Sequence, residues 1–149
     1  MKKTYWAVAV VTTIGMFYGA ALMAHGAADA PDKRVKMQYF KNAQKMKIRS
    51  MNVEGTNAFL QDIVASNDPK APIACGLFRM EKGNALTYTY GYDEAKIIVD
   101  GEMYVNDGAT KVKATKGDVL FFPKGATITF SSDSYGVGFI CGQRAFDGA

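Results

Sequence analysis

From residue 58 to residue 141, short apolar and β-branched runs alternate with turn residues, and this pattern constrains the fold more than any other feature. Runs bounded by Gly, Pro, Asn and Asp in this way are typical of β-strands. The turn sequences Asp100-Gly101 and Asp107-Gly108 favour type I′ hairpins. A series of short strands without a long helix predicts a mainly β protein, with a closed antiparallel barrel or a jelly roll. We expect the strands at 58–65, 73–81, 86–92, 95–100, 102–106, 110–114, 118–123, 127–131 and 136–141.

Two motifs in this region resemble those of the cupin superfamily. Residues 117–125 have the spacing G-x5-P-x-G of the second cupin motif, and Glu94 and Gly101 have the spacing that ends the first motif. The resemblance implies a single cupin-type antiparallel jelly-roll barrel. The whole stretch 73–141 is most similar to the ethanolamine-utilisation cupin subfamily, through residues 92–94, 97–102, 116–119 and 122–125.

The resemblance also implies a site inside the barrel, but the usual metal ligands are missing from it. Cupin enzymes usually hold a metal with two His and a Glu from the first motif and a His from the second. Only Glu94 is retained here. Because the barrel region has no imidazole to offer, we expect no metal site of this type. The histidine positions are held by Tyr88 and Tyr90, or by Thr87 and Thr89 with the longer spacing, and by Ile128.

The polar side chains left at the barrel mouth predict a ligand site made of Tyr88, Tyr90, Glu94 and Arg79. A carboxylate among phenols binds a polar small molecule, and Glu94 is a candidate general base if it is desolvated. The alternative is structural, because tyrosines also fill barrels and a tyrosine hydroxyl satisfies a buried carboxylate.

Cys75 and Cys141 are the only cysteines, and they lie in an early strand and in the last one. If these strands are neighbours in a closed barrel, the two side chains are close together. They then form either a disulfide, as an exported domain permits, or two buried thiols. Both alternatives remain open at this point.

Residues 1–30 form a different, apolar module. Lys2 and Lys3 precede an uncharged run whose core, 5–24, has about the 20 residues that a membrane-spanning helix needs. We expect a transmembrane anchor. The alternative is a signal peptide cleaved near residues 24–28, which leaves a secreted cupin. Small residues spaced by four favour packing against other transmembrane subunits, and these residues are Gly15, Gly19, Ala20 and Ala24.

His25 is the only histidine of the chain, and it follows Ala21 by four residues. This spacing resembles the chlorophyll-binding pattern of light-harvesting helices, which would make His25 a tetrapyrrole ligand. A histidine at the boundary between lipid and water is the simpler interpretation. We therefore predict no cofactor and keep tetrapyrrole ligation as the alternative.

The net charge of +4 is divided unevenly, with +7 on residues 1–49 and −3 on residues 50–149. Asp29 and Pro31 favour the start of a short amphipathic helix in residues 31–55. A basic helix next to a span is attracted to anionic lipid or to an acidic protein surface, and the alternative is a solvated linker. The acidic barrel region has no nucleic-acid-binding motif, so we expect no nucleic acid partner. The basic residues expected to contribute are Lys33, Arg34, Lys36, Lys41 and Lys45.

These features predict three regions: an anchor or signal peptide at 1–30, a basic juxtamembrane helix or linker at 31–55, and the barrel at 56–149. The main functional hypothesis is a single-pass, metal-free cupin that acts as a non-catalytic accessory or structural subunit of a larger membrane complex. Its barrel is expected on the exported side, in a bacterial periplasm, and to support a homodimer. The alternatives are a secreted cupin, and a small-molecule-binding or ethanolamine-utilisation-type enzyme that uses Glu94 and the barrel tyrosines.

Overall fold

The computed structural model describes residues 36–149, which include the whole strand-rich region. Within this part of the chain, no helix is long and apolar enough to cross a membrane. The expectations that lie outside the described residues concern the span itself and Gly15, Gly19, Ala20, Ala24, His25, Lys33 and Arg34.

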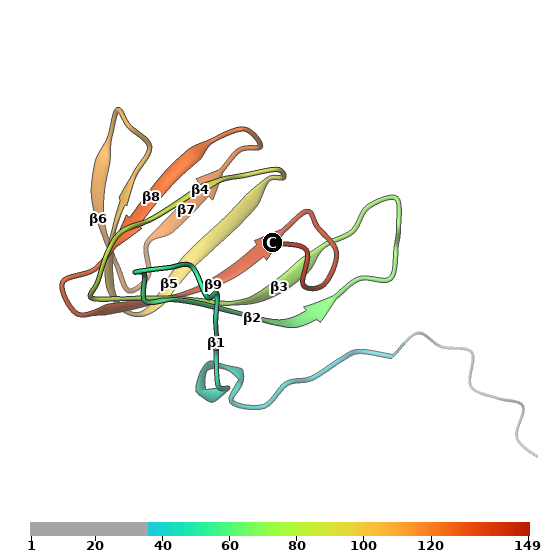
Figure 1. Cartoon of the computed structure of the whole chain (residues 1–149). Helices are drawn as coiled ribbons and strands as arrows, with labels where there is room; N and C mark the ends of the chain where they lie inside the picture. Colours follow the sequence, from blue (N-terminus) through green and yellow to red (C-terminus); the bar gives the residue numbers. More distant parts are fainter. Residues whose placement is uncertain (1–35) are drawn as a thin grey trace, which may run out of the picture. The chain divides into compact units, whose positions relative to one another are not determined.

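Antiparallel strands make up half of the described chain (Figure 1). Their hydrogen-bonded neighbours divide them into one sheet in the order β1-β2-β3-β9-β5-β7 and a second in the order β6-β5-β8-β4. The two sheets curl around one core, as expected for a cupin jelly roll. The strands are β1 Arg49–Ser50, β2 Ala58–Ala65, β3 Ala74–Glu81, β4 Leu86–Thr89, β5 Glu94–Asn106, β6 Lys111–Thr115, β7 Val119–Phe122, β8 Thr127–Ser131 and β9 Tyr135–Gly142.

Strand β5 belongs to both sheets and joins them. Its first part pairs with β7 and β9, and its last part pairs with β6 and β8. A register shift between Ile98 and Asp100, followed by Gly101 in the left-handed region (φ 62°), bends the strand between the two parts. The prediction of a hairpin at 100–101 is therefore wrong, because the chain bends there without reversing its direction.

The second expected hairpin, at Asp107-Gly108, is confirmed between β5 and β6. Its loop runs from residue 107 to residue 110 and is longer than a two-residue type I′ turn. The Asp107 carboxylate accepts hydrogen bonds from the N–H groups of Ala109 and Thr110, at 2.9 and 2.6 Å, and so closes the loop.

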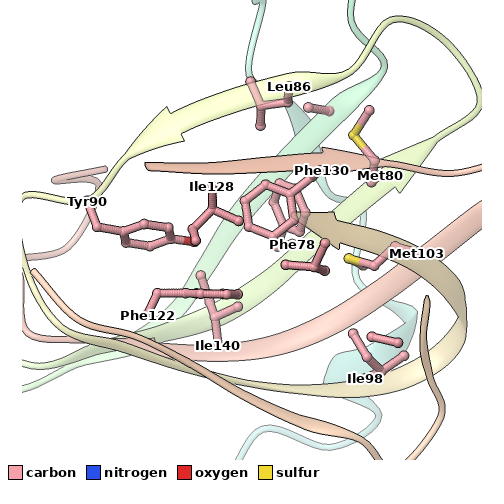
Figure 2. Packing of buried hydrophobic residues seen from close by; sticks show 13 residues of the cluster. Phe78, Met80, Leu86, Tyr90, Ile98, Met103, Phe122, Ile128, Phe130 and Ile140 are labelled. Atoms are coloured by element: carbon pink, nitrogen blue, oxygen red, sulfur yellow. The ribbon is translucent and has the colours of Figure 1, made fainter. Parts of the chain in front are cut away.

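Inward-facing side chains from both sheets fill the barrel, as Figure 2 shows. The Tyr90 ring stacks on Phe122 with centroids 5.0 Å apart, and Phe122 meets Phe130 edge to face at 5.6 Å. Burying one such large side chain contributes about 1.5–3 kcal/mol, so this cluster holds the two sheets together. Its members are Ala58, Phe78, Met80, Leu86, Tyr90, Ile98, Met103, Val105, Ala114, Phe122, Ile128, Phe130 and Ile140.

Cys75 on β3 and Cys141 on β9 stand opposite each other and form a disulfide. Of the two alternatives left open by the sequence, the structure has the bonded pair. The bond joins positions 66 residues apart in sequence, so it restricts the unfolded chain over much of the barrel.

The basic segment before the barrel does not form the expected amphipathic helix over its described residues, 36–55. It contains a single 3₁₀ turn, Ala43–Lys45, which follows Asn42 in the left-handed region (φ 56°). At Met46 the backbone becomes extended, and Arg49 then pairs with Leu60 of β2. Arg49 and Ser50 pair with the edge of the sheet, and this extended conformation excludes a helix at the end of the segment. The expected basic residues in this segment, Lys36, Lys41 and Lys45, are exposed.

Candidate ligand-binding site

Strand β4 determines which side chains enter the barrel at its mouth. The Oγ1 atoms of Thr87 and Thr89 meet those of two threonines on β8, at 2.9 and 2.8 Å, on the outer side of the sheet. Tyr88 and Tyr90 alternate with them and pack in or against the core. Tyr88 and Tyr90 therefore hold the inward positions expected for the histidines of the first motif. Thr87 and Thr89, the alternative pair, face outward.

Glu94 is the first residue of β5, and its carboxylate lies inside the barrel with only 3% of the residue exposed. The buried Tyr90 hydroxyl donates a hydrogen bond to Glu94 Oε1 at 3.0 Å. Burial, together with the charge of Glu94, raises the pKa of Tyr90 far above its ordinary value, so the phenol remains a donor. The structure thus brings together two of the residues that the sequence assigned to one site.

Lys96 lies two residues after Glu94 on the same strand and points into the same interior, with 2% of the residue exposed. Its Nζ atom is 3.6 Å from Glu94 Oε1 and lies over the rings of Phe78 and Phe130, at 3.9 and 4.4 Å from their centroids. Burial lowers the pKa of Lys96 to about 8, although the nearby Glu94 favours the charged form. The barrel therefore holds an amine that changes protonation state near neutral pH.

Tyr88 and Tyr92 surround Tyr90 and complete the polar side of the site. Their hydroxyls are 3.5 Å apart, and both rings meet the Tyr90 ring edge to face, at 5.0 and 5.7 Å between centroids. Burial and the hydrogen bond with Tyr88 raise the pKa of Tyr92 well above its ordinary value. The Tyr92 phenol is therefore a hydrogen-bond donor over the ordinary pH range.

A buried ion pair supports the outer side of this aromatic group. The Arg144 guanidinium lies 5.6 Å from the centroid of the Tyr92 ring and donates two hydrogen bonds to Asp62, at 2.6 and 2.7 Å. Burial alone would raise the pKa of Asp62, but these bonds and one from the Asp147 N–H group outweigh it and keep the pKa below its ordinary value. The sequence analysis did not identify this pair.

A cavity of about 30 Å³ lies between Glu94, Lys96 and the three tyrosines. Its polar groups are Glu94, Lys96 and the tyrosine hydroxyls, and the other lining residues are mainly apolar, including Phe78, Phe130 and Ile140. A cavity of this size has room for roughly two water molecules, so it suits a ligand of a few non-hydrogen atoms. An apolar cavity with a few convergent polar groups is the usual form of a small-molecule site.

The residues here do not fit the metal centre that a cupin fold implies. The two inward positions of the first motif present phenols, and burial raises the pKa of one of them, Tyr90. The position of the last histidine holds Ile128, which is part of the apolar core. Glu94 has an ammonium group beside it, at 3.6 Å from Lys96. A divalent cation at Glu94 would meet this positive charge and lack imidazole ligands.

Arg79, the fourth residue of the predicted ligand site, is not brought to this cavity. Its neighbours Phe78 and Met80 face the core, so the alternation of β3 turns Arg79 to the outer face. There its Nε donates to Glu81 at 2.6 Å, and its guanidinium lies 4.6 Å from the centroid of the Tyr135 ring.

Lys96 is the candidate site residue that the sequence analysis missed, although the signal was present. Once Glu94 is placed inside the barrel by the cupin spacing, the period of two along a strand places Lys96 on the same face. The residue type alone does not indicate an inward position, because lysine is rarely buried without a partner.

The comparison with known families decides what kind of barrel this is. The model of the family described as Ethanolamine utilisation protein EutQ matches residues 26–141. The chain belongs to the EutQ family. This confirms the resemblance to ethanolamine-utilisation cupins, and the match covers the barrel from its first strand into its last one.

Two EutQ relatives are described as acetate kinases. The one from Clostridioides difficile strain 630 is 35% identical over 63 residues, which are 42% of this chain and 40% of the relative. The one from Escherichia coli K12 is 33% identical over 75 residues, which are 50% of this chain and 31% of the relative. The matched segment thus covers less than half the length of each of these curated relatives.

Solved EutQ structures have the same fold. The Clostridium difficile EutQ structure is 26% identical with a TM-score of 0.52, over 59% of this chain and 68% of that one. A EutQ structure from Salmonella typhimurium LT2 is also 26% identical, with a TM-score of 0.53 over 62% of this chain and 76% of that one. An RmlC-like cupin from Shewanella frigidimarina, 16% identical, shares the fold with a TM-score of 0.57 over 73% of this chain and 93% of that one.

Proposed function

We propose that this EutQ-family barrel binds a small carboxylate of the acetate class in the cavity beside Lys96. The observation that carries the proposal is the Lys96 amine, buried in a mainly apolar cavity next to Glu94. Two relatives that match part of the chain are described as acetate kinases, which supports acetate as the first ligand to test.

The charges of the site leave room for an anionic ligand. Glu94 faces the Lys96 ammonium and accepts the hydrogen bond of Tyr90, so its negative charge is already compensated. A lysine ammonium has three N–H donors and one carboxylate does not use them all. A second carboxylate engages the remaining donors, and charge-assisted hydrogen bonds of this kind are the stronger ones in a dry site.

The shape of the cavity fits the other end of such a ligand. Phe78, Phe130 and Ile140 contribute apolar wall next to the polar groups, so a methyl group is removed from water while the carboxylate meets Lys96. The hydroxyls of Tyr88 and Tyr92 belong to tyrosines that line the same cavity, and they supply neutral donors for the second carboxylate oxygen.

Titration of the whole chain with acetate tests this proposal, using calorimetry or NMR. We expect saturable binding by the wild type, and a loss of at least about tenfold in affinity in Lys96→Met, since one charge-assisted hydrogen bond is lost. Tyr88→Phe removes one hydroxyl with little change of volume and is expected to weaken binding less. Lys113→Met, which removes an exposed lysine paired with Glu102, is the matched control and is expected to bind as the wild type does.

Ethanolamine and divalent metals are titrated in parallel because they separate the alternatives. Binding of ethanolamine without acetate, abolished by Glu94→Gln, would show that the carboxylate rather than the amine selects the ligand. Metal binding abolished by the same substitution would contradict the conclusion that these residues do not fit a metal centre. Equal acetate affinity in Lys96→Met and Lys113→Met would contradict the proposal itself.

A further inference from the structure

The amine of Lys96 lies in surroundings that are unusual for a lysine. Its Nζ contacts the faces of Phe78 and Phe130 and lines the cavity, while its acidic neighbour Glu94 is 3.6 Å away, beyond ordinary hydrogen-bond length. A lysine that is desolvated in an apolar pocket is activated as a nucleophile toward carbonyl compounds.

The protonation state favours such a reaction. Burial lowers the pKa of Lys96 to about 8, so a substantial fraction of the amine is neutral near pH 8. An ordinary lysine, with a pKa near 10.4, carries roughly two hundredfold less neutral amine at neutral pH. The exposed Lys113 is a contrasting case, because its hydrogen bond with Glu102 raises its pKa.

We propose that Lys96 Nζ condenses with a one- or two-carbon aldehyde in the barrel cavity, with Glu94 as the proton relay. The nitrogen lone pair forms a bond to the carbonyl carbon, and the C=O π electrons move to the oxygen. Glu94 takes the proton from nitrogen and passes it to this oxygen, which gives a carbinolamine. Glu94 then takes the remaining N–H proton of the carbinolamine and delivers it to the hydroxyl. The C–O bond breaks, the hydroxyl leaves as water, and the nitrogen lone pair forms the second C–N bond of the imine.

The cavity sets the size of the aldehyde. Its volume of about 30 Å³ accommodates only a few non-hydrogen atoms, so formaldehyde and acetaldehyde fit and an aromatic aldehyde does not. The Phe78 and Phe130 faces limit water around the nitrogen, which slows hydrolysis of the imine once it has formed. This inference rests on the ligand cavity of the proposed function, but not on the choice of a carboxylate.

Reductive trapping tests the inference on the intact chain. The protein is incubated with acetaldehyde and cyanoborohydride near neutral pH, and the ethylated lysines are located by peptide mass spectrometry. We expect Lys96 to be ethylated at least about tenfold faster than Lys113, and benzaldehyde to reverse this order because of its size. Modification of Lys113 with Lys96 unmodified would overturn the inference.

Two further measurements separate this inference from the proposed function and from a folding defect. Glu94→Gln keeps the shape of the side chain. A cooperative thermal unfolding transition is the check that this variant folds. The variant is expected to label Lys96 at least about fivefold more slowly, and an unchanged rate would exclude Glu94 as the relay. If acetate binds but Lys96 is not labelled, the aldehyde inference alone fails. If Lys96 is labelled and acetate neither binds nor protects it, the carboxylate function alone fails.

Discussion

A lysine ammonium moved from water into an apolar barrel costs several kcal/mol unless a partner compensates its charge. In this chain the partner is Glu94, and the faces of Phe78 and Phe130 add a cation–π contribution. Glu94 in turn depends on Lys96 and Tyr90. The pair therefore acts as one unit, in the part of the fold where metal-binding cupins have a cation and its ligands.

A double-mutant cycle measures this dependence. Glu94→Gln and Lys96→Met each leave one buried charge without its partner, so each is expected to lower the free energy of unfolding by about 3–5 kcal/mol. The double variant has no buried charge at this position and is expected to lose less than the larger of the two single losses. Urea unfolding provides the measurement, and additive losses would show that the two residues act independently.

The pH dependence of stability follows from the same lysine. Since the pKa of Lys96 falls from 10.5 to about 8 on folding, the unfolded chain binds more protons between these values, and stability rises with pH there. We expect the free energy of unfolding to increase by about 2 kcal/mol from pH 7 to pH 9.5 relative to Lys96→Met. Above about pH 10 the raised pKa of Tyr90 has the opposite effect, because only the unfolded tyrosine ionises. Identical pH profiles for the two proteins would contradict the burial of a titrating amine.

At the level of elements, the sequence predicted most of the strands but not the one that organises them. Strands β2 and β8 have the expected bounds, because turn residues delimit them on both sides. The expected strands at 95–100 and 102–106 are one bent strand, β5, since Asp-Gly marks a hairpin and a bend equally well. Only the pairing partners distinguish the two: β5 pairs with β9 up to Gly101 and continues with β6 and β8 beyond it. Pairing partners far apart in sequence are not visible in local patterns.

Two glycines of positive φ provide a matched test of this bend. A Cβ at Gly101 (φ 62°) would collide with the Tyr135 carbonyl oxygen, whereas a Cβ at Gly108 (φ 93°) meets nothing within 4 Å. Gly108→Ala is expected to cost about 1–2 kcal/mol from its backbone conformation alone. Gly101→Ala is expected to cost a further 1–3 kcal/mol or so from overpacking. Equal losses in thermal or urea unfolding would show that close packing against β9 does not hold the bend.

For the whole molecule, the spacing of the cupin motifs predicts the barrel and its family. Residues 1–30 lie outside the part of the chain that the structure describes. The cupin spacings are local and survive in the sequence, so the fold and the position of Glu94 could be predicted. The position of Arg79 could not be predicted, because the alternation of β3 turns its side chain to the outer face. The predicted juxtamembrane helix is wrong over the described residues, because the end of this segment pairs with β2. The membrane-anchored accessory role rests on residues that the structure does not describe, and it stays a prediction.

Membrane fractionation of the full chain tests that prediction. If residues 5–24 are a retained span, the protein is expected to stay in the membrane fraction after an alkaline wash and to keep its N-terminal Met1. A variant without residues 1–30 is expected to move to the supernatant. A native N-terminus near Ala27 or Asp29 would instead establish cleavage of a signal peptide.

The proposed site depends on Lys96 being a buried amine that meets the ligand inside the barrel. The most direct measurement is an NMR titration of the Lys96 side chain with pH, with and without acetate. We predict a pKa of about 8 for Lys96 in the free protein, and a saturable increase when acetate binds, because an anion beside the amine favours its charged form. An ordinary lysine pKa near 10.4 that acetate does not change would contradict the account.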